Sequence, residues 1–148
     1  ISDRPFDGYF QTFMYSIWGR QAGFPTLVPV GDIQVKSQIA RPRPYEVVPK
    51  GTNYRMIGAA GAGESDVTKV EVSDDRGESW AEARLLGEPV RFAWRYWEHD
   101  WRAPERIGPH ILMARATDSK GRMQPLERDK DRRDAVINHV LPIEVEIR

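Results

Sequence analysis

The side chains that could carry chemistry in this chain are three histidines, a pair of acids in a predicted hairpin and one dense run of charges. His99, His110 and His139 form no i, i+4 pair and lie in no cluster of acids of the kind that binds zinc. His99 lies between Glu98 and Asp100 and is the best metal candidate. Because successive residues of a strand point to opposite faces, a structural role for this triplet is favoured.

Two further motifs have ordinary structural explanations. The sequence GAAGAG at 58–63 lacks the Lys-Ser/Thr ending of a phosphate-binding loop, and no helical pattern follows it, so it predicts a strand and a turn. Asp74 and Asp75 are only two adjacent carboxylates, which favours turn chemistry over calcium binding. No nucleophile-elbow motif occurs, and without cysteine there is no disulfide, thiolate metal site or thiol nucleophile. The residues by themselves therefore predict no catalytic, cofactor-binding or metal-binding side chain.

The densest charged run is ERDKDRRD at 127–134, and taken alone it is typical of a solvated loop. Over the whole chain, 22 basic and 22 acidic side chains cancel, which argues against a general attraction to nucleic acid or to an anionic membrane. No apolar run reaches the roughly 20 residues that a membrane span needs. We therefore predict no nucleic-acid and no membrane partner.

The length of the chain and its first residues limit the possible domain organisation. With 148 residues the chain can form one domain with a real core but not two ordinary domains. The first residue is Ile1, and nothing near it resembles a signal peptide, so we expect a piece of a longer protein. The lack of cysteine leaves the compartment open.

The elements that would position any site are predicted to be strands. Residues 1–31 carry scattered aromatic side chains broken by Gly and Pro, which predicts an irregular arm or linker that lies on an apolar surface. Residues 32–148 show short alternating segments between turn signals, which predicts an all-β antiparallel sandwich of at least seven strands. Within it, KVEVSDDRGESW at 69–80 predicts a hairpin whose Trp80 closes one end of the core. The side chains expected to point into the core are Ile57, Val70, Val72, Trp80, Ile111, Met113 and Val145.

An ordered set of motifs resembles a known family. From Val35 to the end of the chain, the motifs S-x-I-x-x-P, G-A-A-G, V-E-V-S-x-D-x-G-x-x-W, W-R-x-W and R-A-x-D-x-x-G-x-x-Q-P follow one another. Together they resemble the C-terminal dimerisation domain of sulfite-oxidase-type molybdenum oxidoreductases. One departure is Arg76, where the family most often has Gly or a similar turn residue, and it bears on the geometry of the turn.

The resemblance implies an immunoglobulin-like β-sandwich appended to a catalytic domain of the same polypeptide. That catalytic domain carries molybdenum, held by molybdopterin (a pyranopterin dithiolene) and by a cysteine thiolate. Since this chain has no cysteine, we expect no cofactor in it and no activity from it alone. The resemblance further implies a homodimer, an arm that packs across the boundary with the catalytic domain, and a periplasmic location as one option for a compartment that stays unknown.

The resemblance also implies a substrate-binding role for one arginine of the charged run. In the family, an arginine shortly before the last strand helps to form the anion pocket beside molybdenum. Counting back without gaps from PIEVEI assigns this position to Arg133, with Arg132 as the near alternative. Arginine keeps its charge at any working pH and offers a planar fork to an oxyanion. On an extended segment only one of the two would face the pocket, and its neighbour would pair with Asp131 or Asp134.

A different class of function is a free-standing immunoglobulin-like module that binds a ligand or carbohydrate. The segment RFAWRYWEHDW at 91–101 would supply the surface, with Trp94, Trp97 and Trp101 stacking on the ligand. Alternation along the strand predicts that about half of its rings are in the core and that Phe92, Trp94 and Tyr96 share one face.

Overall fold

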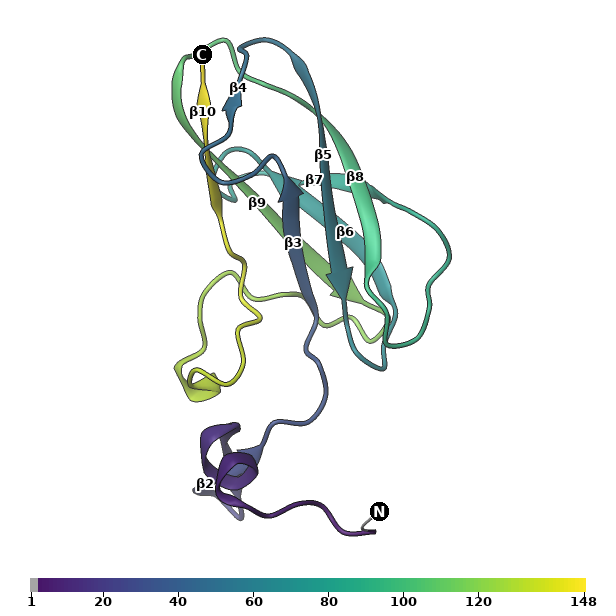
Figure 1. Cartoon of the computed structure of the whole chain (residues 1–148), viewed down its shortest axis with the longest axis vertical. Coiled ribbons are helices and arrows are strands. Elements are labelled where there is room, and N and C mark those ends of the chain that lie inside the picture. Colours follow the sequence, from purple (N-terminus) through teal and green to yellow (C-terminus); the bar gives the residue numbers. More distant parts are fainter. Residues whose placement is uncertain (1–2) are drawn as a thin grey trace.

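The computed structural model describes residues 3–148 and is built almost entirely of strands (Figure 1). A single π-helical turn, η1 (Phe10–Met14), and a 3-10 turn, η2 (Lys130–Arg132), are the helical segments of the described residues. Neither has the length or apolar character that a membrane-crossing helix requires. The strands are β1 (Ser16–Gln21), β2 (Phe24–Pro29), β3 (Lys36–Arg41), β4 (Val47–Val48), β5 (Asn53–Gly61), β6 (Val67–Ser73), β7 (Ala81–Leu85), β8 (Arg95–Arg102), β9 (Gly108–Asp118) and β10 (Ile143–Ile147).

Eight strands form one hydrogen-bonded series, in the order β3-β5-β8-β7-β6-β9-β10-β4, that folds over into two layers. The layer of β3, β5 and β8 crosses the layer of β6, β7 and β9, and the hydrophobic core lies between them (Figure 1). All pairings in this series are antiparallel except the two-residue contact of β4 with β10. The predicted immunoglobulin-like antiparallel sandwich is confirmed.

The centre of the core is the Trp97 ring, which is fully buried and lies over Gly58 of the neighbouring strand β5. A Cβ atom at Gly58 would come within 2.1 Å of Trp97 Cζ2, so only glycine leaves room for this ring. The indole Nε1 donates a hydrogen bond of 3.0 Å to Ser37 Oγ, so the one polar atom of the ring is satisfied inside the core.

The predicted core residues are partly right. Val70, Val72 and Val145 are buried in the core, and Met113 is buried too, although it lies outside the core cluster. Ile57 and Ile111 are only half-buried, and their neighbours Met56 and Leu112 point into the core instead. The prediction fails there because both alternating phases of these strands carry apolar residues, so that the pattern does not choose between them.

Trp80 does not close the core, contrary to the prediction. Val72 pairs with Ala81 across the hairpin, so Trp80 falls in the outward phase of its strand. Its half-buried ring lies beneath the Arg115 guanidinium, with Cζ 4.0 Å from the ring centroid, and its Nε1 donates a 3.0 Å hydrogen bond to the Gly77 carbonyl. The ring covers the outside of the sheet rather than its interior.

The hairpin turn itself follows the predicted turn chemistry. The Asp75 carboxylate accepts hydrogen bonds from Ser79 Oγ at 2.6 Å, from the Ser79 backbone N–H at 2.9 Å and from Ser73 Oγ at 2.7 Å. These donors hold the pKa of Asp75 well below its usual range. Arg76 has φ 62°, in the left-handed region that favours glycine. This backbone conformation explains why Gly or a similar turn residue is common at this position in the family.

The segment before residue 32 contains an ordered hairpin that its sequence does not announce. β1 and β2 pair over six residues, and Ala22 and Gly23 make the turn with φ 49° and 86°. The hairpin lies beyond one end of the sandwich (Figure 1). Many of the aromatic side chains of this arm are exposed to solvent: Phe6, Tyr9, Phe10, Phe13, Tyr15, Trp18 and Phe24.

Candidate functional site

Arg133 anchors the arm to the charged loop. Its Nη1 donates hydrogen bonds to Ser16 Oγ at 2.7 Å, to the Ser16 carbonyl at 3.3 Å and to the Phe13 carbonyl at 2.5 Å. The guanidinium also lies over the Phe13 ring, with Cζ 5.1 Å from the centroid. Ser16 is fully buried and itself donates to the Phe13 carbonyl, so this junction is ordered on both sides.

The rest of the Arg133 guanidinium remains available. All three hydrogen bonds use Nη1, whereas Nε and Nη2 make no hydrogen bond or ion pair with residues 3–148. These two nitrogens form the side edge of the fork that binds an oxyanion through two parallel hydrogen bonds. Arg133 has φ 52°, an uncommon backbone conformation for a side chain of this size.

The neighbouring charges pair differently from the sequence-based expectation. The segment is not extended: it forms η2, and the N-cap residue Asp129 accepts a hydrogen bond from the Asp131 N–H at 2.9 Å. Arg132 Nε lies 3.4 Å from Asp129 Oδ2, so its partner is Asp129 rather than Asp131 or Asp134. Asp134 instead pairs with Arg128. The two adjacent arginines therefore differ: Arg132 already has a carboxylate, and Arg133 has only neutral oxygens.

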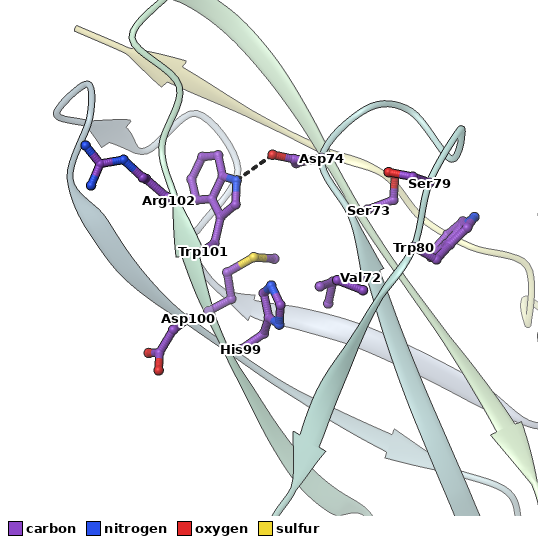
Figure 2. Close-up of a pocket in the computed structure, with 11 residues that line it drawn as sticks. Val72, Ser73, Asp74, Ser79, Trp80, His99, Asp100, Trp101 and Arg102 are labelled. Atoms are coloured by element: carbon purple, nitrogen blue, oxygen red, sulfur yellow. Dashed lines mark hydrogen bonds between the residues drawn. The ribbon is translucent and has the colours of Figure 1, made fainter.

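Apart from the Arg133 junction, the structure has a cavity where β7 and β8 separate (Figure 2). The two strands pair at Arg84–Glu98 and Leu85–Trp97 and then diverge, leaving a cavity of about 320 Å³. Its lining residues are Met56, Val72, Ser73, Asp74, Ser79, Trp80, Ala81, His99, Asp100, Trp101 and Arg102. Figure 2 shows His99 and Trp101 on the side of Val72, whereas Asp100 and Arg102 point away.

Two polar groups of this cavity, Trp101 and Asp74, are engaged in a structural contact. Trp101 Nε1 donates a 2.8 Å hydrogen bond to Asp74 Oδ2, and the Trp101 ring stacks on His110 with centroids 5.6 Å apart. His110 Nε2 lies 3.9 Å from the same Asp74 oxygen, beyond hydrogen-bond distance. The cavity contains aromatic packing and one satisfied acid, and it offers no converging set of ligands.

The chain does not fit the molybdenum cofactor of the family. Among residues 3–148, no group of three or more His, Asp or Glu side chains could hold a metal ion, and the sequence has no cysteine to supply a thiolate. Figure 2 shows His99 on the inner side and Asp100 pointing away, and Glu98 pairs with the exposed side chains of Arg55 and Arg84, as the alternation of the strand predicts. No step of chemistry at molybdenum is therefore assigned to this chain.

The three tryptophans of 91–101 do not form a platform for a ligand. Trp97 and Trp101 are buried, with exposed fractions of 0% and 5%, and only Trp94 is open to solvent. The exposed rings are Phe92, Trp94 and Tyr96, but only Tyr96 lies in β8, whereas Trp94 precedes the strand and Phe92 lies in a turn with φ 63°. A carbohydrate-binding surface built from the three tryptophans is therefore absent from the described residues.

The sequence reasoning misses the arm side of the junction. Nothing in the sequence distinguishes Ser16 or Phe13 from the other polar and aromatic residues of the arm, because their role depends on an arginine more than 100 residues away. Likewise Gln124, which is 1% exposed, joins β3 to β9 by accepting hydrogen bonds from the backbone N–H groups of Ser37 and Ala116. Only a motif position, Q-P, marks this glutamine in the sequence.

The comparisons with known proteins agree with the fold. A family model described as "Mo-co oxidoreductase dimerisation domain" matches residues 28–140. The sulfite oxidase of Gallus gallus is 33% identical over 107 residues, covering 69% of this chain and 23% of that protein. The NADPH nitrate reductase of Aspergillus niger is 29% identical over 119 residues, covering 64% of this chain and 14% of that protein. The crystal structure of the sulfane dehydrogenase SoxCD from Paracoccus pantotrophus superposes with a TM-score of 0.75 at 24% identity, covering 96% of this chain and 37% of that one.

The chain spans less than a quarter of the length of the two curated relatives. The description of the family refers to oxidoreductases with a molybdenum cofactor and to a domain that serves their dimerisation. Because the family model matches most of its length, this chain belongs to the dimerisation domains of the molybdenum-cofactor oxidoreductases of the sulfite oxidase family.

Proposed function

We propose that this chain is the non-catalytic assembly domain of a molybdopterin-dependent oxidoreductase. In this proposal residues 32–148 pair two subunits, and residues 1–31 connect the domain to the catalytic molybdenum domain of the same polypeptide. Substrate oxidation or reduction belongs to the catalytic domain, where molybdenum supplies the redox chemistry. The family match over residues 28–140 carries the assembly role.

We further propose that Arg133 contributes to the substrate anion pocket of the whole protein, with Arg132 as the alternative. The observation that carries this proposal is that one nitrogen of the Arg133 guanidinium makes all of its hydrogen bonds, whereas the other two nitrogens make none with the described residues. Ser16 and Phe13 accept the hydrogen bonds of Nη1, which fixes the orientation of the guanidinium plane. The Nε–Nη2 edge has no partner among residues 3–148. A pre-oriented fork loses less side-chain entropy when it binds an oxyanion. Arg132, paired with Asp129, would have to release a carboxylate first.

The relatives name the anions to test. One is named a sulfite oxidase and another a nitrate reductase. Sulfite and nitrate are small oxyanions of the kind that a guanidinium can bind through two parallel hydrogen bonds. In the full-length parent, Arg133→Met should raise KM for its oxyanion substrate by about 10- to 100-fold, because a charge-assisted hydrogen bond contributes about 1.5–3 kcal/mol. The dissociation constant of sulfate, used as a dead-end anion, should rise in parallel.

Arg132→Met is the matched control for this experiment. It removes the same charge from the neighbouring position and should leave both KM and sulfate affinity within about twofold, a difference far below 1.4 kcal/mol. The reverse result would move the role to Arg132, and unchanged constants in both variants would leave the run as a solvated loop. Arg133→Lys adds a second test, since a lysine keeps the charge but lacks the fork.

A further inference from the structure

We propose that the connection between β3 and β4 forms a binding site for a tetrahedral oxyanion such as phosphate or sulfate. This connection runs from the end of β3 to β4, close to β10 (Figure 1). Its residues surround a cavity of about 370 Å³, lined by Arg41, Arg43, Pro44, Tyr45 and Glu46. The site does not depend on the assembly role or on the role of Arg133 proposed above.

The backbone of the connection directs two arginines into the same cavity. In the run Arg41-Pro42-Arg43-Pro44, each arginine precedes a proline. A residue before proline is restricted to extended conformations, so the backbone of both arginines is confined before a ligand binds. Pro42 is fully buried, whereas Arg41 and Arg43 are exposed and line the cavity. The segment therefore buries its proline and presents both guanidinium groups at one opening.

Neither arginine of this cavity has an acidic partner. Arg41 and Arg43 form no ion pair with residues 3–148. The carboxylate in the lining, Glu46, uses its two oxygens elsewhere: Oε2 accepts a 2.8 Å hydrogen bond from the Arg43 backbone N–H, and Oε1 accepts a 2.6 Å hydrogen bond from the Tyr54 hydroxyl. The lining thus contains two guanidinium groups and one carboxylate, an excess of one positive charge.

Both guanidinium groups lie close to this carboxylate without pairing with it. The pKa of Glu46 is below its ordinary value, first because the Arg43 backbone N–H and the Tyr54 hydroxyl bind its charged form. The positive charges of Arg41 and Arg43 lower this pKa further. A tetrahedral dianion brings two negative charges and four acceptor oxygens, so it can accept from two guanidinium forks at once. A planar monoanion such as nitrate brings half the charge.

Tyr45 forms another wall of the cavity in an uncommon backbone conformation. Its φ is 64°, and its backbone N–H donates a 2.6 Å hydrogen bond to the Glu144 carbonyl. The ring is 76% exposed, so packing in the core does not account for this conformation. Its hydroxyl has no hydrogen-bond partner among residues 3–148. Residues held in such conformations cluster at binding sites, where the surrounding structure fixes them before the ligand arrives.

The first test is an NMR titration of the 148-residue chain with phosphate, sulfate, nitrate and acetate. Chloride keeps the ionic strength constant, and backbone amide shifts are followed at about pH 7. Phosphate or sulfate should shift the amides of Arg43, Tyr45 and Glu46 to saturation with a dissociation constant of about 1 mM, the scale of two charge-assisted hydrogen bonds after the cost of ordering. The dianion with the lower constant identifies the preferred ligand. Nitrate and acetate should bind at least about 10-fold more weakly.

The second test repeats the titration with charge variants. Arg43→Gln removes one fork but keeps the backbone N–H that binds Glu46, and the dissociation constant should rise about 10-fold or more. Arg41→Gln should weaken binding similarly, and Arg43→Lys should recover only part of the loss because lysine lacks the fork. Glu46→Gln removes the negative charge, so the constant should fall about threefold or more. Equal melting temperatures would exclude unfolding as the cause.

Arg106→Gln is the matched control. Arg106 is also exposed and forms no ion pair with the described residues, but it lies outside the cavity, in the connection between β8 and β9. Its substitution should leave the constant within about twofold.

The outcomes decide between a built site and general surface charge. Amide shifts that grow linearly with phosphate and sulfate, or equal weakening by Arg43→Gln and Arg106→Gln, would overturn the site. Loss in Arg43→Gln with none in Arg41→Gln would overturn a site made by two forks. Nitrate that binds as tightly as both dianions would overturn the tetrahedral ligand class. Weaker binding in both cavity variants, with tighter binding in Glu46→Gln, would support the proposal.

Discussion

Arg133 Nη1 and Ser16 Oγ are joined by a hydrogen bond of 2.7 Å across 117 positions of the chain. This contact and the two carbonyl contacts beside it hold the arm on the loop that precedes the last strand. The junction links the segment proposed to face the catalytic domain with the arginine proposed to face its substrate. Any change that frees the arm should therefore also change the orientation of the guanidinium.

Removing this anchor should loosen the arm. In Arg133→Ala the arm loses three hydrogen bonds to a charged donor, and we expect its local opening free energy to fall by about 1–3 kcal/mol. Amide hydrogen exchange in β1 should accelerate about 5- to 150-fold, and chymotrypsin should cut faster at the aromatic residues of the arm. Arg132→Ala is the control, since Arg132 contacts Asp129 and not the arm. Equal acceleration in both variants would contradict the anchor.

Trp80 and Trp97 should differ in their contribution to stability. Trp97 is fully buried, and Trp97→Ala should lower the free energy of unfolding by about 3–5 kcal/mol. Trp80 is half-buried beneath Arg115, so Trp80→Ala should cost only about 1–2 kcal/mol, from partial burial and the cation–π contact. Urea unfolding of the two variants measures both values. A loss as large for Trp80 as for Trp97 would place the Trp80 ring inside the core after all.

Gly58 should tolerate no side chain. Gly58→Ala would place a methyl group 2.1 Å from Trp97 Cζ2 and 2.3 Å from the Gln38 carbonyl oxygen, and a backbone atom cannot simply turn away. We expect a loss of about 3 kcal/mol or more, at the upper end of the overpacking range. Gly31→Ala is the control, because nothing lies within 4 Å of its added Cβ and its φ is not positive. It should melt within a few degrees of the wild type.

Asp118 should make the fold sensitive to acid. Burial opposes its charge, but the Arg122 guanidinium and the backbone N–H groups of Arg122 and Lys120 outweigh burial and hold its pKa below the usual value. Because the folded pKa is the lower one, the stability contributed by ionised Asp118 is complete above the unfolded pKa of about 3.9 and is lost as pH falls toward the folded pKa.

The variant Asp118→Asn tests this dependence. At about pH 7 it should be less stable than the wild type by about 2–4 kcal/mol, since Arg122 loses its carboxylate. The difference should shrink below about pH 4, where the wild type begins to lose the same interaction. Urea unfolding across this range gives both curves, and a difference that stays constant with pH would mean that another group controls the acid response.

Local sequence patterns were sufficient for much of the fold. The hairpin at 69–80 carries its turn chemistry in adjacent residues, since Asp75 contacts Ser73 and Ser79 within the same segment. Val70 and Val72 alternate with charged residues, so their inward direction follows from the strand period alone. The ordered motifs carried the family resemblance, and the family model over residues 28–140 confirms it.

Tertiary structure decided what the local pattern left ambiguous. Met56 and Ile57 are both apolar, and the inward side was chosen by the Trp97 ring, which needs the space above Gly58 on the same strand face as Met56. Trp80 carries the same aromatic signal as a core residue, yet its pairing phase turned it outward onto Arg115. Alternation shows that successive side chains point to opposite faces, but when both sets are apolar it does not show which face points into the core.

The sequence by itself determined that this chain is a cysteine-free β-sandwich of a molybdenum-oxidoreductase family and that two adjacent arginines are its candidate anion ligands. It did not determine which arginine has a free edge or what holds it. That choice depends on Asp129 capturing Arg132 within the η2 turn and on Ser16 and Phe13 reaching Arg133 from the opposite end of the chain. Contacts between residues so far apart exist only after the chain has folded, so no local pattern of residue types can encode them visibly.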